Sequence, residues 1–191
     1  MALVYTRGGI HGNVITLTTD FGVHDGYVAA MKGVILRIAP GVSLVDVSHD
    51  VAPQDVAGAA YLLAGVYRFF PPGTVHLVVV DPGVGTQRRG LAVRADEQLF
   101  VAPDNGVLTP VLDAATRIAI VSLTNARYWL GEVSHTFHGR DIFAPVAAHL
   151  ARGVPLEELG VSIGDPVRLG LPEPRVRGGL VEGTVVWVDH F

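Results

Sequence analysis

The sequence predicts an α/β domain with a mainly parallel central sheet flanked by helices. Apolar runs rich in β-branched residues alternate with helical periodicity, in the order strand, helix, strand, helix, strand. The connections are short, as expected for right-handed βαβ units. The run over 75–80 is apolar apart from His76, which favours a strand that is covered on both faces.

Five elements are expected in the first half of the chain, each delimited by turn residues. The strand over 14–19 ends at Asp20, and the helix over 25–39 ends at Pro40-Gly41. Asp25 is a candidate N-cap of that helix. The remaining elements of this half are a strand over 43–47, a helix over 55–70 closed by prolines, and the strand over 75–80.

The second half is expected to begin with a hairpin, in which strands over 91–95 and 98–102 are joined by a turn at Asp96-Glu97. A short helix over 107–112, a strand over 117–123 and a helix over 140–152 follow. Gly153 stands where a helix of this kind ends. A strong strand pattern resumes over 180–188.

These elements divide the chain into four expected parts. Residues 1–13 are interpreted as a leader or a cloning remnant, and residues 14–163 as the α/β domain. Residues 164–179 contain prolines and arginines without periodicity and are interpreted as a linker. Residues 180–191 are expected to be the first strand of a second, β-rich domain. Because such a strand needs a partner, the rest of that domain is expected to be missing.

The composition excludes several classes of function. The net charge of −4 gives no electrostatic case for binding nucleic acid or an anionic membrane. The absence of cysteine excludes disulfides, thiolate metal sites and a cysteine nucleophile. No apolar run reaches the roughly 18 residues that a membrane helix needs, and residues 1–13 lack the apolar core of a signal peptide. A soluble, cytoplasmic enzyme or binding domain is therefore expected.

Polar residues gather where predicted strands end. Asp20 follows the first strand, and Asp81 follows the third, with Arg88 and Arg89 close behind it. In open α/β sheets, ligands bind beyond the carboxyl ends of strands, so these loops are candidate sites. The alternative is a β-turn with a surface ion pair, and this stretch alone favours neither. His138, which precedes the last helix, has the same two interpretations: a ligand contact or a capping residue.

Familiar cofactor motifs are absent from the sequence. No GxGxxG opens the first helix, Gly83-Val84-Gly85 lacks the lysine of a P-loop, and no GxSxG elbow is present. Metal binding by Asp20, Asp25 and Asp81 is conceivable, but their spacing does not require it. We therefore expect no cofactor and no metal.

Six stretches, read together, resemble one known family. They are ITLTTDFG at 15–22, YVAAMKGV at 27–34, DVSH at 46–49, VDPGVGT at 80–86 followed by Arg88-Arg89, PDNG at 103–106, and TFHGRDIF at 136–143. This set is similar to the S-adenosyl-L-methionine hydrolases, or hydroxide adenosyltransferases, which are relatives of the fluorinase and chlorinase. The resemblance implies that family's N-terminal domain fold, a homotrimer, and a C-terminal β-barrel domain that is largely missing here. Such a chain would lack part of the adenine pocket and have weak or no activity.

The resemblance also implies roles for individual residues. Asp81, Arg88 and His138 would hold and polarise a water that attacks ribose C5′ of S-adenosylmethionine, and adenosine and methionine would leave without a cofactor. The implied substrate-binding residues are Asp20 at the ribose hydroxyls, Asp25 and Asp189 near the methionine ammonium, and Asn105. Gln54 stands where some relatives place an aromatic residue.

Two alternatives to hydrolysis stay open at this point. The first is halide-dependent adenosyl transfer, as in the halogenating relatives. It is disfavoured because those relatives carry a tyrosine or another residue at the positions of Asp81 and His138, and a carboxylate repels a halide. The second alternative is a non-catalytic protein that binds an adenosyl ligand.

Overall fold

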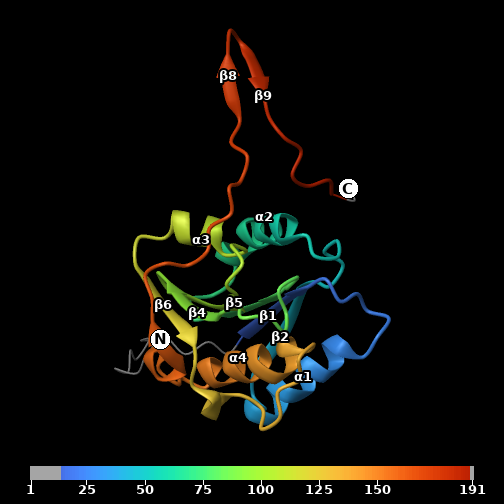
Figure 1. The fold of residues 1–191 in the computed structure, drawn as a ribbon, viewed down its shortest axis with the longest axis vertical. Coiled ribbons are helices and arrows are strands. Elements are labelled where there is room, and N and C mark those ends of the chain that lie inside the picture. The colour runs from blue at the N-terminus through green and yellow to red at the C-terminus, as the bar shows by residue number, and fades with distance from the viewer. Residues whose placement is uncertain (1–13, 190–191) are drawn as a thin grey trace, which may run out of the picture.

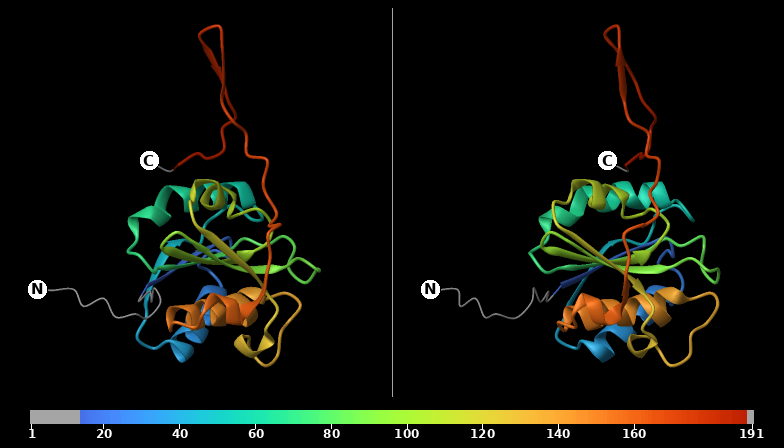
Figure 2. Two further views of the ribbon diagram at one scale, coloured as in Figure 1. Left: turned by 90° about the vertical axis from the view of Figure 1, so that its left-hand side faces the viewer. Right: turned by 60° about the vertical axis from the view of Figure 1, so that its left-hand side comes forward.

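The computed structural model of the chain describes residues 14–189 and shows a central sheet between two layers of helices (Figure 1). Helices α1 and α4 cover one face of the sheet, and α2 and α3 cover the other (Figures 1 and 2). Their bounds are Tyr27–Ile38 for α1, Val56–Val66 for α2, Thr109–Ala114 for α3 and Ala144–Ala151 for α4. This layering confirms the predicted α/β class.

The strands of the sheet lie in the order β2-β1-β3-β5-β4-β6-β7. Their bounds are Val14–Thr19 (β1), Ser43–Ser48 (β2), Val75–Val79 (β3), Gly90–Ala95 (β4), Gln98–Pro103 (β5), Ile118–Leu123 (β6) and Gly160–Ser162 (β7). β2, β1, β3 and β5 pair in parallel, whereas β4 and β7 each pair antiparallel to their neighbours. Since β6 runs in the same direction as β1, the sheet is mainly parallel, as predicted.

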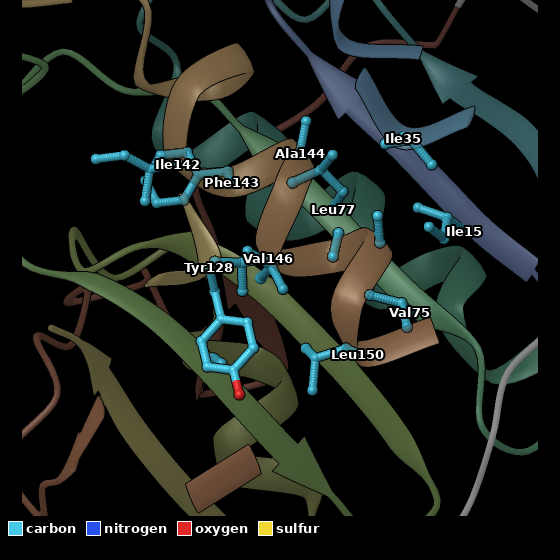
Figure 3. Close-up of a cluster of buried hydrophobic side chains, with 14 of the residues drawn as sticks. Ile15, Ile35, Val75, Leu77, Tyr128, Ile142, Phe143, Ala144, Val146 and Leu150 are labelled. Atoms are coloured by element: carbon cyan, nitrogen blue, oxygen red, sulfur yellow. The ribbon is translucent and has the colours of Figure 1, made fainter. Parts of the chain in front are cut away.

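Strand β3 lies in the middle of the sheet and is buried along its whole length. Val75 and Leu77 belong to the hydrophobic cluster beneath α4 (Figure 3). Val78 and Val80 belong to the cluster on the opposite face. Because side chains alternate along a strand, burial on both faces requires an unbroken apolar run, which is the pattern that predicted this strand.

Two helix starts differ from the prediction. The N-cap of α1 is Gly26, with no side-chain capping bond, so the prediction that Asp25 caps this helix is wrong. Helix α3 starts after the predicted position because Asn105 Oδ1 accepts from the N–H of Val107, which places these residues in a turn. Gly106, with φ of 91°, supplies the left-handed residue that this turn needs.

Short helical segments account for the other differences. α2 ends at Val66 and continues as a 3₁₀ turn, η1 (Tyr67–Phe69). The helix predicted over 140–152 begins as a π-helical turn, η3 (Gly139–Phe143), before α4. The 3₁₀ turns η2 (Ala126–Tyr128) and η4 (Leu156–Leu159) were not predicted. Such short segments carry too little periodicity to be recognised in a sequence.

Near the end of the described chain, β8 (Arg175–Arg177) and β9 (Leu180–Glu182) form a hairpin that stands away from the body of the molecule (Figures 1 and 2). Gly178 and Gly179, both with positive φ, make its turn. The strand predicted over 180–188 is therefore wrong beyond Glu182, because its partner strand β8 is only three residues long. The predicted leader over 1–13 lies outside the described residues, and the expected domain boundaries stay predictions.

Candidate active site

Four segments of the chain, at residues 20–21, 53–54, 79–84 and 136–139, meet at one end of the sheet and line a cavity of about 260 Å³. Asp20 follows β1, Asp81 follows β3, and His138 precedes η3. All three side chains line the cavity. β1 and β3 are parallel neighbours, so their carboxyl ends bring the two carboxylates to the same edge. The structure thus brings together residues that are more than one hundred positions apart.

Asp81 and Arg88 form a buried ion pair beside this cavity. The side chains are only 5% and 9% exposed, respectively. Arg88 Nε donates to Asp81 Oδ1 over 3.0 Å, and Arg88 Nη2 donates to Asp81 Oδ2. The ring of Phe143 lies 5.2 Å from the guanidinium carbon. Because both carboxylate oxygens accept from one planar fork, the pair has a fixed geometry rather than that of a mobile surface contact.

Arg88 also contacts His138, whose Nδ1 lies 3.1 Å from Nη2. A guanidinium can only donate hydrogen bonds, so Nδ1 accepts this bond and the ring proton is on Nε2. Burial lowers the pKa of His138, and the positive charge of Arg88 lowers it further. Geometry and charge therefore agree on a neutral imidazole with an N–H at Nε2.

Burial shifts the pKa of Asp81 in the opposite direction from that of His138. It raises the pKa of Asp81 above its ordinary value, and the charge of Arg88 offsets only part of this. A carboxylate whose pKa is raised is a better proton acceptor than an ordinary one. The set formed by Asp81, Arg88 and His138, which we call the Asp–Arg–His set, thus combines a strengthened base, a fixed cation and a neutral donor.

A buried carboxylate fixes the loop that carries His138. Asp141 is fully buried and accepts from the backbone N–H of Ser134 over 2.9 Å and from its hydroxyl over 2.7 Å. Burial acts to raise the pKa of Asp141, but the bonds from Arg140 and Ser134 outweigh it and the pKa is lowered. These bonds hold the loop from 134 to 138 against the start of η3, a π-helical turn of the kind often found at functional sites.

Asp20 is held by the backbone of Gln54, whose N–H donates to Asp20 Oδ2 over 2.8 Å. Gln54 has φ of 65°, a left-handed conformation that is rare for a side-chain-bearing residue. Behind this contact, His49 Nδ1 lies 2.9 Å from Thr19 Oγ1, and the His49 carbonyl accepts from Gly22 over 2.7 Å. His49 thus has a structural role beside this contact.

An aromatic wall was not predicted as part of the site. Phe21 and Phe137 line the cavity, and each packs edge-on or tilted against Tyr27, with ring centroids 5.9 and 5.1 Å apart. Each phenylalanine is the sequence neighbour of a polar candidate: Phe21 follows Asp20, and Phe137 precedes His138. Their position next to these residues could have indicated that the phenylalanines line the site. An apolar residue beside a polar one is usually a core residue, however, so this indication is weak.

The other predicted site residues lie away from the cavity. Asp25 is exposed in the loop before α1, and Asp189 is exposed near the end of the described chain. Asn105 does not line the cavity, and its Nδ2 donates to the carbonyl of Val80 over 2.8 Å. Arg89 pairs with Asp104 and Asp165.

Residues 14–189 contain neither a cluster of metal-binding side chains nor a helix that could span a membrane. No group of three or more His, Asp or Glu side chains is placed to hold a metal ion there. None of the helices in this part of the chain combines the length and apolar character needed to cross a membrane.

Comparison with known proteins gives consistent matches. The family described as "SAM hydroxide adenosyltransferase N-terminal domain" matches residues 15–160. An (R)-S-adenosyl-L-methionine hydrolase from Salinispora tropica is 50% identical over 186 residues, which cover 93% of this chain and 69% of the relative. A fluorinase from Actinoplanes sp. is 34% identical over 207 residues, covering 94% of this chain and 70% of that enzyme. The crystal structure of an uncharacterized conserved protein from Thermotoga maritima superposes with a TM-score of 0.89 at 44% identity, over 93% of this chain and 68% of that one.

Proposed function

Because this chain belongs to the SAM hydroxide adenosyltransferase family, we propose that it hydrolyses S-adenosyl-L-methionine to adenosine and L-methionine. The observation that supports this most directly is the contact of Arg88 with both Asp81 and His138 at the edge of the cavity. The similarity to hydrolases from Salinispora tropica and Thermus thermophilus supports the same substrate.

In the proposed reaction, a water oxygen attacks ribose C5′ while the bond from C5′ to the sulfonium sulfur breaks. The electron pair of that bond stays on sulfur, so methionine leaves as a neutral thioether. The water loses one proton, and adenosine keeps the oxygen with the other. A sulfonium is already a good leaving group, so the site has to supply in-line placement and a nucleophile stripped of bulk solvent.

The geometry of the Asp–Arg–His set suggests a division of roles. Asp81 takes the proton, because its pKa is raised and its carboxylate still has free lone pairs beside the two bonds from Arg88. Arg88 stabilises the hydroxide-like charge that develops on the attacking oxygen. His138 orients the water as a donor through Nε2–H, because Nδ1 already accepts from Arg88. Asp20, which also lines the cavity, accepts from the ribose hydroxyls.

Halide-dependent adenosyl transfer is the second candidate, since the chain is also similar to fluorinases. The buried carboxylate of Asp81 argues against it, because a halide beside this group would meet a negative charge in a poorly solvated place. Product analysis separates the candidates. Hydrolysis gives adenosine at the same rate with and without chloride or fluoride, whereas transfer gives a 5′-halogenated nucleoside. Binding measured by calorimetry without either product would instead indicate a non-catalytic binder.

We extend the proposal to assembly and location, both of which follow from the family resemblance. The chain is proposed to act as a homotrimer in the cytoplasm, with S-adenosylmethionine as its small-molecule partner. Light scattering after size exclusion tests the assembly, for which a mass three times the 20.2 kDa of the chain is expected. A monomeric mass would contradict it.

A further inference from the structure

The loop that joins β3 to β4 carries Asp81 and Arg88, and both of its ends are held by the same neighbour. That neighbour is the short loop after β5, with Asp104 and Asn105 at its centre. Asn105 Nδ2 donates to the carbonyl of Val80, the residue before Asp81, over 2.8 Å. Asp104 Oδ2 accepts from Arg89, the residue after Arg88, over 2.7 Å.

Both polar atoms of the Asn105 amide make a hydrogen bond within the protein. While Nδ2 donates to Val80, Oδ1 accepts from the N–H of Val107 over 3.2 Å. Val80 is completely buried and lies just beyond the end of β3, where the hydrogen bonds of the sheet stop. The Asn105 amide therefore satisfies a buried carbonyl that would otherwise lack a partner, and fixes the point from which Asp81 projects.

Asp104 holds the other end of the loop through an ion pair with Arg89. Its side chain is only 2% exposed, and Arg89 Nη2 lies 2.7 Å from Oδ2. The Arg89 carbonyl accepts from the N–H of Asp104 over 2.9 Å and from Arg88 Nη1 over 3.2 Å. The Arg88 guanidinium, which binds Asp81, thus donates to the Arg89 carbonyl, and Asp104 fixes the position of that carbonyl.

We infer that Asp104 and Asn105 are positioning residues for the ion pair of Asp81 and Arg88, acting through Arg89 and Val80 respectively. The loop between the anchors contains Pro82, Gly83 and Gly85, and a glycine-containing loop has many accessible conformations. Fixing both ends restricts it to the one that aligns the pair with the cavity. For catalysis the inference rests on the proposed function, but the placement of the pair can be measured without it.

The test compares Asn105→Ala and Asn105→Asp with the control Asp113→Asn. Asn105→Asp keeps the side-chain size and the bond from Val107 but cannot donate to Val80. Asp113 lies on α3, is largely exposed and pairs with Arg168, so its substitution removes a carboxylate without touching the loop. We expect both Asn105 variants to lower kcat about ten- to a hundredfold, as misplacement of reacting groups does, with less than about a threefold change in the dissociation constant for S-adenosylmethionine. Asp113→Asn leaves both unchanged.

An independent readout is the NMR signal of the Arg88 Nε–H, which donates to Asp81. We expect it to be protected from exchange in the wild type and in Asp113→Asn, and to shift and exchange faster in both Asn105 variants and in Asp104→Asn. An unchanged Arg88 signal in these variants would overturn the inference. So would loss of ligand affinity in the Asn105 variants with the signal intact, since Asn105 would then be a substrate contact. If the wild type releases no adenosine, the proposed function fails, and the NMR comparison still decides the positioning role.

Discussion

Arg88 Nη2 lies 3.1 Å from His138 Nδ1, and the same guanidinium holds both carboxylate oxygens of Asp81. One cation therefore sets the orientation of the acid and the tautomer of the imidazole at once. The consequence is that the members of the Asp–Arg–His set cannot be exchanged for residues of equal charge without loss of geometry.

Arg88→Lys keeps the positive charge but removes the planar fork. A lysine ammonium cannot hold both oxygens of Asp81 and also reach His138, so we expect adenosine release to fall about 100-fold or more. Arg117→Lys is the matched control, because Arg117 is 77% exposed at the far end of the sheet. Steady-state rates measure both variants, and a near-normal kcat in Arg88→Lys would contradict the assigned role.

The pH dependence of kcat/KM follows from the two shifted groups. The pKa of Asp81 is raised above 3.8, and that of His138 is lowered below 6.5, in each case chiefly by burial. The reaction needs Asp81 ionised and His138 neutral, so activity is lost as the pH falls. Because the pKa of Asp81 is raised by burial, we expect the midpoint of the acid limb to lie above 3.8, the ordinary value for an aspartate. An acid limb with its midpoint at or below pH 3.8 would contradict the role of Asp81 as the proton acceptor.

His76 makes the stability of the fold sensitive to acid. It is fully buried, stacked on Phe100, and its pKa is lowered from 6.5 to about 4 by burial. As the pH falls below 6.5, His76 takes up a proton in the unfolded chain but stays neutral in the folded chain. The free energy of unfolding is therefore highest above pH 6.5 and decreases as the pH falls towards 4. The loss is about 3 kcal/mol at most. Urea unfolding from pH 7.5 to 4.5 should show this slope.

His76→Phe should flatten that slope, since the variant has no proton to bind at this position. His24→Gln serves as the control, because His24 is exposed in the loop before α1. An equal slope in wild type and His76→Phe would mean that other groups cause the acid sensitivity.

Gln54 tests whether backbone strain is stored beside the cavity. Its φ of 65° favours glycine, so Gln54→Gly should be more stable than Gln54→Ala by about 1 kcal/mol. Both variants keep the N–H that donates to Asp20 and lose the same side-chain contacts. Thermal unfolding of the pair measures the difference, and an alanine variant as stable as the glycine variant would argue against strain.

The centre of the sheet could be predicted from the sequence because β3, β4 and β5 are buried along almost their whole length and are therefore largely apolar. Asp20, Asp81 and His138 could be singled out because they stand where such elements end. The pattern alone could not tell Arg88 from Arg89, since adjacent arginines differ only in what the fold places near them. Asn105 could also be singled out from the sequence. The sequence could not show that its amide donates to the carbonyl of Val80 and does not line the cavity. The phenylalanines of the aromatic wall look like core residues in sequence.

The central claim is that water attacks ribose C5′. The most direct test is to run the reaction in H₂¹⁸O and determine the isotope content of the products by mass spectrometry. The account predicts adenosine that carries one ¹⁸O atom at its 5′ hydroxyl, together with unlabelled methionine. Unlabelled adenosine, or label found in the methionine, would contradict it.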